Sequence, residues 1–115
     1  RGADPEERTR ALDVLAATAD QRAVSALVDV ARDPKRSASV VAALATLPED
    51  RVAWLRPALG DDDVQVRCTV IEALGRMRHR AASALLAEAL RDPHEGVHAA
   101  AAYALARADL RATTG

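Results

Sequence analysis

The chain has 115 residues, which is enough for one domain with a single modest core. Half of the residues are apolar but only 2% are aromatic, and 28 are alanine, a composition that favours closely packed helices over a β-sandwich. The near balance of 16 basic and 17 acidic residues argues against a dedicated nucleic-acid binder, and a single cysteine, Cys68, excludes an intramolecular disulfide.

Targeting signals are absent from the sequence as it stands. No uncharged run is long enough to span a bilayer, and no signal peptide is visible, so we expect a cytoplasmic protein that does not contact a membrane. Because the chain begins at Arg1 rather than Met, we expect residues 1–115 to form one domain that is a fragment or a domain of a longer protein.

An internal repeat of about 30 residues runs through the chain. Residues 22–28 align with residues 80–86 at five of seven positions, and each block runs on to an Asp-Pro pair. A second alignment, offset by 31 residues, joins the middle of the chain to its end. A period of this length with no strand signal is typical of a pair of short helices.

Seven helices are predicted in chain order, and connections of about two to four residues require neighbouring helices to be antiparallel. Asp-Pro pairs at residues 4–5, 33–34 and 92–93 each indicate an N-cap followed by proline at the first helical position. Residues 61–63, all aspartate, are expected to cap the next helix in the same way. The predicted helices are 5–18, 21–32, 35–47, 50–59, 63–77, 80–91 and 94–108.

Apolar residues recur at helical spacing, most clearly in the predicted helix 63–77. One face of this helix is therefore expected to lie in the core. Trp54, the largest apolar side chain, is predicted to seal the outer helix 50–59 against its neighbours. The predicted core residues of helix 63–77 are Val66, Val70, Ala73, Leu74 and Met77.

Two stretches carry a family resemblance. Asp20-Gln21-Arg22-Ala23 with the later Asp33-Pro34, and Asp63-Val64-Gln65-Val66-Arg67 with the later Ala73-Leu74-Gly75, resemble HEAT-like repeats of the phycobilisome-lyase type. The resemblance covers nearly the whole chain as about three and a half repeats. It departs from the family pattern in the second repeat, which lacks a clean Val-Arg pair, and at His98, which stands where Arg is expected.

This resemblance implies an all-α, right-handed HEAT-like α-solenoid whose inner helices line a concave, partner-binding face. It also leaves open an alternative function as a subunit or domain of an enzyme complex, such as a phycobilin-lyase-like protein. The scarcity of aromatic residues opposes tight binding of a flat tetrapyrrole, and no cofactor is predicted.

The inner helices implied by the resemblance are 5–18, 35–47, 63–77 and 94–108. Helical geometry turns Gln65, Cys68, Glu72 and Arg76 away from the core stripe, and the repeat offsets place Asp13, Ala42 and Tyr103 level with Glu72. We predict a shallow groove with acidic points and one aromatic anchor, suited to a protein or peptide that carries basic residues. An ordinary solvated face is the alternative. The predicted partner-binding residues are Asp13, Glu72, Arg76, Tyr103 and Arg107.

The segment His94-Glu95-Gly96-Val97-His98 fits the H-E-x-x-H pattern of zinc metalloproteases. That chemistry needs two histidines one turn apart on a helix and a glutamate that activates water. The motif instead follows an Asp-Pro pair in the first turn of a helix, Gly96 weakens that turn, and the repeat accounts for Val97. A zinc hydrolase is therefore the least favoured function, and His94 and His98 are candidates only for adventitious metal binding.

The predicted C-terminal helix 94–108 is apolar nearly all round. Such a helix expects neighbours on more than one side, so further repeats or self-association are predicted there. The alternative is that alanine is simply a good helix former.

Arg76, Arg78 and Arg80 form the densest basic cluster, but the arginines are interleaved with acidic residues, so no nucleic-acid partner is predicted. The sequence as a whole predicts a non-catalytic protein-interaction module, either a scaffold or an adaptor.

Overall fold

A computed structural model describes residues 20–114 of the chain, with their side chains as far as residue 108. The predicted helix 5–18, its Asp-Pro cap at 4–5 and Asp13 lie outside the described residues. Within them the chain is helical and contains no strand. The elements are α2 (Gln21–Val30), η1 (Pro34–Arg36), α3 (Ser37–Leu44), η2 (Glu49–Gly60), α4 (Val64–Arg76), α5 (Arg80–Ala89) and α6 (Glu95–Thr114).

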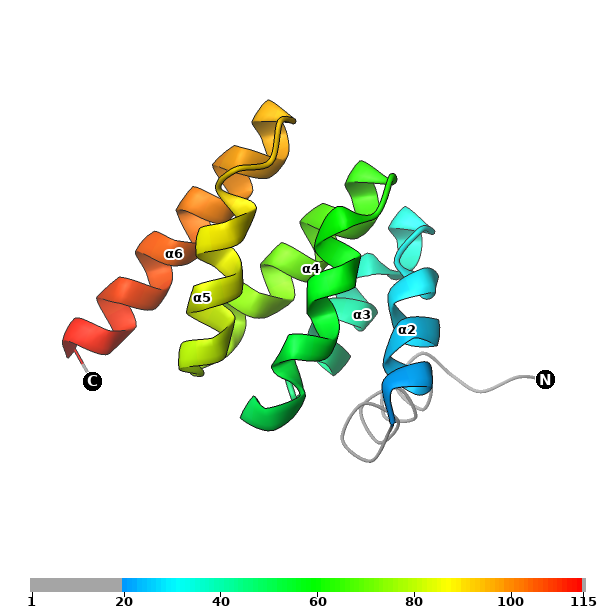
Figure 1. Cartoon of the computed structure of the whole chain (residues 1–115), viewed down its shortest axis with the longest axis horizontal. Helices are drawn as coiled ribbons and strands as arrows, with labels where there is room; N and C mark the ends of the chain where they lie inside the picture. The colour runs from blue at the N-terminus through cyan, green and yellow to red at the C-terminus, as the bar shows by residue number, and fades with distance from the viewer. Residues whose placement is uncertain (1–19, 115) are drawn as a thin grey trace.

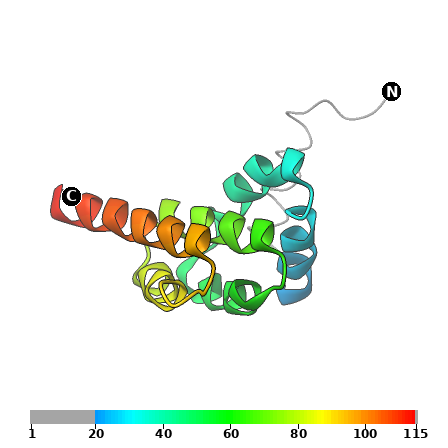
Figure 2. The same ribbon diagram turned by 90° about the horizontal axis from the view of Figure 1, so that it is seen from above.

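The helices form two layers. Figure 2 shows α3, α4 and α6 in one layer and α2, η2 and α5 in the other, and successive pairs stand side by side along the molecule (Figure 1). We call these the inner layer and the outer layer, since they match the inner and outer helices that the resemblance implies. Contacts run both between the layers and along each of them, so the described part of the chain is an all-α solenoid, as predicted.

Two predicted helices differ in form from the prediction. Residues 35–47 divide into a 3₁₀ turn, η1, and a short α-helix, α3. The outer helix predicted at 50–59 is 3₁₀ throughout, over the twelve residues of η2. Pro57 lies inside η2 and gives a physical reason, because in an α-helix its ring would clash with the carbonyl of Ala53. The last helix is longer than predicted, since α6 continues to Thr114.

The aspartate caps are partly as predicted. Asp33 Oδ1 accepts from the Lys35 backbone N–H at 3.0 Å, and Asp63 Oδ1 accepts from that of Gln65 at 2.9 Å. The prediction for Asp92 is wrong, because α6 begins only at Glu95. Asp92 closes a turn just before the helix by accepting from the His94 N–H.

The core is built from aliphatic side chains of both layers. All five core residues of the predicted helix 63–77 are buried, which confirms the apolar stripe. Trp54 is half-buried and packs on the edge of this core, as predicted, with the Arg51 guanidinium 5.6 Å from its ring centroid. None of the described helices is long and apolar enough to cross a membrane.

The two longest helices of the inner layer are in close contact at Gly75 of α4 and Ala104 of α6. Both residues are buried. A Cβ atom added at Gly75 would lie only 2.8 Å from the Ala104 Cβ, which is closer than real Cβ atoms approach other atoms. Gly75 does not have a positive φ, so its backbone conformation does not require glycine. Glycine is required here because the two helices leave no space for a side chain.

Candidate protein-interaction face

The solvent-facing side of the inner layer contains the predicted partner-binding residues that the structure describes. On this side Ala42, Gln65 and Cys68 are half-buried. We call this surface the inner face. Its exposed residues include Ala38 of α3, Thr46 just after α3, Glu72 and Arg76 of α4, and Ala99, Tyr103 and Arg107 of α6.

The four predicted residues form two pairs, one on each helix. Arg76 Nη2 lies 3.3 Å from Glu72 Oε2 on α4. On α6 the Arg107 guanidinium carbon lies 5.7 Å from the centroid of the Tyr103 ring, within the range of a cation–π contact. Tyr103 is 67% exposed and is the exposed large apolar side chain of the described residues. The aromatic anchor therefore faces solvent and is available for contact.

The Gly75–Ala104 contact brings these two pairs to the same part of the inner face. Arg76 follows Gly75 directly, and Tyr103 directly precedes Ala104. Glu72 and Arg107 are each about one turn away from the contact. The repeat offset predicted that Glu72 and Tyr103 lie in one row. The close contact between α4 and α6 at Gly75 and Ala104 was not predicted.

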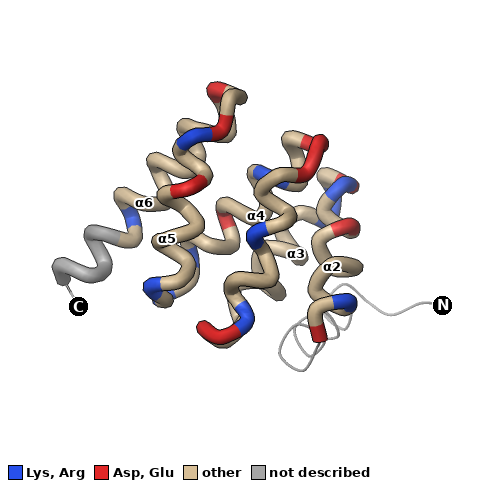
Figure 3. Tube along the Cα trace, in the orientation of Figure 1, with Lys and Arg blue, Asp and Glu red and all other residues tan. Residues whose placement is uncertain are grey.

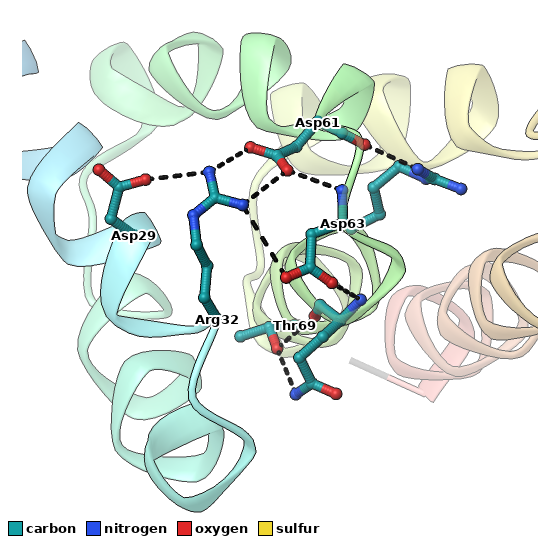
Figure 4. Close-up of polar contacts among 7 residues, drawn as sticks. Asp29, Arg32, Asp61, Asp63 and Thr69 are labelled. Carbon is teal, nitrogen blue, oxygen red and sulfur yellow. Dashed lines mark hydrogen bonds and ion pairs between the residues drawn. The ribbon is translucent and has the colours of Figure 1, made fainter.

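A cluster of ionic contacts joins the loops at one edge of the solenoid (Figure 4). Arg32, just after α2, donates to both carboxylate oxygens of Asp61, at 3.0 and 2.7 Å, and to Asp29 at 3.1 Å. Asp61 also accepts from the Asp63 backbone N–H at 2.8 Å. The Arg32 guanidinium, followed by this backbone N–H, lowers the pKa of the Asp61 carboxyl, and Asp61 in turn raises the pKa of Arg32.

A second bridge continues the cluster into the next helix pair. Arg67 of α4 donates to the Asp61 carbonyl oxygen at 2.7 Å, and its Nε lies 2.8 Å from Asp92 Oδ2. Only 14% of the Arg67 side chain and 8% of the Asp92 side chain are exposed. We call the Arg32–Asp61 and Arg67–Asp92 contacts the loop ladder. Sequence reasoning missed the ladder, although Asp61 and Asp92 are separated by the 31-residue repeat offset and so could have suggested it.

Acid should weaken the first bridge of the ladder. The folded state lowers the pKa of Asp61, so its contribution to stability is present at neutral pH and is lost as the pH falls below about 4. We expect the difference in urea midpoint between wild type and Asp61→Asn to be largest at pH 7 and to shrink toward pH 3. Asp50→Asn, at an exposed carboxylate in the first turn of η2, is the control. A difference that stays constant with pH would contradict the role given to Asp61.

The two histidines of the H-E-x-x-H motif each use Nδ1 in a local contact. His94 Nδ1 accepts from the Gly96 backbone N–H at 3.1 Å, and His98 Nδ1 lies 2.6 Å from the Leu90 carbonyl oxygen. Both histidines thus serve the turn that begins α6. Among the described residues no group of three His, Cys, Asp or Glu side chains could hold a metal ion.

Cys68 is placed as a structural thiol. It is half-buried on α4, and burial is the main cause that raises its pKa. A raised pKa keeps the thiol protonated at neutral pH, which is the opposite of what a nucleophilic cysteine needs.

The exposed side of α6 carries Ala99, Ala102 and Ala106. The predicted contact of this helix with further repeats or a second subunit stays a prediction.

Comparison with known families agrees with this geometry. A model of HEAT repeats matches residues 35–106, which is more than half of the chain and includes α3, η2, α4, α5 and most of the described part of α6. No curated protein and no solved structure is significantly similar to the chain. The predicted HEAT-like repeat is confirmed, and its phycobilisome-lyase type stays a prediction. The two-layered helix pairs and the family match together show that the chain belongs to the HEAT-repeat family.

Proposed function

We propose that the chain is a non-catalytic interaction module that holds a partner protein or peptide on its inner face. The observation that carries this proposal is Tyr103, a large side chain left 67% exposed beside Arg107 on the inner face. Tyrosine and arginine are the residues that most often dominate binding energy at protein interfaces. HEAT repeats are commonly protein-interaction scaffolds, which supports the same function.

A rigid helical layer suits this function. The inner-layer helices are held by a continuous core and by the loop ladder, so the face is formed before a partner arrives. Binding to a preformed face loses little conformational entropy.

We place this interaction in the cytoplasm, in keeping with the single free cysteine.

Catalytic alternatives have weaker support. A phycobilin-lyase-like role would require a surface for a flat tetrapyrrole, and among the described residues of the inner face Tyr103 is the aromatic side chain. A zinc hydrolase would require a metal centre, whereas His94 and His98 are engaged in the turn before α6. We therefore propose a scaffold or adaptor rather than an enzyme.

The test is affinity capture from a lysate of the source cells with matched blocking variants. Ala38→Trp places a bulky ring on the inner face, and Ala84→Trp places the same ring on an exposed position of the outer helix α5. We expect a partner that is retained by wild type and by Ala84→Trp but is lost by Ala38→Trp and weakened by Tyr103→Ala. A partner lost by Ala84→Trp and retained by Ala38→Trp would show that the outer layer is the binding surface.

A further inference from the structure

Exposed carboxylates and arginines are unevenly distributed along the inner layer, although both signs occur at each end of its helices. The loops and first turns at the start of these helices hold the exposed Asp62 and Glu95, together with the exposed Arg36 and Arg91. Arginines lie toward the opposite ends, where Arg76 ends α4, Arg78 follows in the turn to α5, and Arg107 lies well along α6. Figure 3 shows red together with blue near the loops before α4 and α6, blue at the turn between α4 and α5, and red at the start of η2.

We call Arg76, Arg78, Arg107 and Tyr103 the arginine end of the inner face. Its compactness follows from the Gly75–Ala104 contact, because Arg76 and Arg107 both lie within about one helical turn of it. Arg78 comes two residues after Arg76 across Met77, which is extended and buried, so Arg76 and Arg78 flank a residue that is anchored in the core. Arg80 is left out, since the Glu49 carboxylate lies against the first turn of α5.

The arginine end carries more positive than negative charge among the described residues. Two acidic residues lie beside it: Glu49, whose carboxylate accepts from the Ala81 N–H near Arg78, and Glu72, which meets Arg76 in a pair whose side chains are about half exposed, at 50% and 55%. An exposed pair within one helix contributes little, so Arg76 can exchange Glu72 for another carboxylate at small cost. At the other end of the face the aspartates already have strong partners, since Asp61 meets Arg32 and Asp92 meets Arg67.

We propose that the partner held on the inner face presents an acidic peptide segment to the arginine end. This proposal rests on the proposed function and reverses the sign of charge that the sequence alone suggested for the partner. The carboxylates of such a segment would meet the guanidinium groups of Arg76, Arg78 and Arg107, which bind carboxylates in a planar, two-pronged geometry. An apolar residue of the same segment would pack on the exposed ring of Tyr103.

The exposed carboxylates at the other end of the face disfavour a nucleic acid as the partner. The thirteen residues of α4 span about 20 Å. A nucleic-acid strand that follows the helices over that length would bring phosphates from the arginines to the exposed carboxylates of Asp62 and Glu95. A peptide can confine its acidic residues to one end, so its charge matches the face along the whole length.

The test measures fluorescence anisotropy with a labelled synthetic peptide of about twelve residues, a length that matches α4. The peptide carries four glutamates and one phenylalanine on an alanine background, and a second peptide has glutamine at each glutamate position. We expect the acidic peptide to bind, to bind more weakly as salt is raised, and to lose about tenfold or more in affinity with Arg76→Gln/Arg107→Gln.

The matched control is Arg36→Gln/Arg91→Gln, which removes two exposed arginines near the opposite edge, one at the end of η1 and one after α5, and changes the net charge equally. An equal loss with this control would overturn the proposal, because overall charge would then explain binding. Absence of binding by the acidic peptide would also overturn it. If a short single-stranded RNA binds more tightly than the acidic peptide, and its binding depends on Arg76 and Arg107, the partner of this face is a nucleic acid and the peptide proposal is overturned.

The failure of this proposal can be told apart from failure of the proposed function. If the glutamine peptide binds as well as the acidic one and Ala38→Trp blocks both, the inner face binds peptides and the acidic preference is wrong. If Ala84→Trp blocks binding and Ala38→Trp does not, the inner face itself is the wrong surface.

Discussion

Replacing Arg67 with methionine is expected to lower the free energy of unfolding by about 3 kcal/mol. The reason is that Asp92, with only 8% of its side chain exposed, would be left buried without its guanidinium partner. The Asp61 carbonyl would lose its hydrogen bond from Arg67 as well. The measurement is urea unfolding followed by the circular dichroism of the helices.

The control for Arg67 is a salt bridge of similar length whose side chains are exposed to solvent. Arg56 of η2 meets Glu88 of α5 at 2.8 Å, but 58% and 50% of these side chains are exposed. Arg56→Met should therefore change stability by less than about 1 kcal/mol. The double variant Arg67→Met/Asp92→Asn should recover part of the loss, because it removes the unpaired charge and keeps an acceptor for the His94 N–H. An Arg67→Met variant as stable as Arg56→Met would show that the second bridge does not stabilise the fold.

Replacing Gly75 with alanine is expected to lower the free energy of unfolding by about 2 kcal/mol, within the range measured for overpacked cores. The added Cβ would lie 2.8 Å from the Ala104 Cβ and 3.5 Å from its Cα, so α4 and α6 must move apart. Alanine has a higher helix propensity than glycine by about 1 kcal/mol, which offsets part of the steric cost. The expected loss of about 2 kcal/mol is the net result.

A second substitution identifies the cause of that loss. Ala104→Gly removes the methyl group that the new side chain would meet, so Gly75→Ala/Ala104→Gly should be more stable than the sum of the two single variants predicts. Gly60→Ala is the control, because nothing lies within 4 Å of a Cβ added there. Additive effects of Gly75→Ala and Ala104→Gly would contradict a direct contact between α4 and α6 at this point.

Local patterns in the sequence predicted the helices well and their form less well. The spacing of Val66, Val70 and Leu74 identified the buried side of α4, because one contiguous core sets that spacing. The same reasoning treated residues 50–59 as an ordinary helix, although Pro57 is incompatible with an α-helical turn at its position. Asp92-Pro93 resembled the cap at Asp33-Pro34, and only the structure showed that α6 begins later.

The candidate site shows where sequence reasoning reaches its limit. Repeat offsets placed Glu72 and Tyr103 level with each other, since periodicity carries position along the solenoid. They could not show that Glu72 is paired with Arg76, which changes the charge that the face presents. The buried Arg67–Asp92 bridge was also missed, because a contact between successive repeats depends on how the repeats stack.

The loop ladder has a consequence for how the molecule unfolds. Each of its bridges joins one helix pair to the next, so its energy belongs to the interfaces between repeats rather than to any one repeat. A repeat array behaves as a single cooperative unit only when such coupling outweighs the weak intrinsic stability of its members. In this chain η2 is a 3₁₀ helix with poorer hydrogen-bond geometry than an α-helix, so its repeat depends on its neighbours to stay folded. Arg32, just after α2, and Arg67 of α4 therefore govern whether the solenoid melts in one step or frays from its ends.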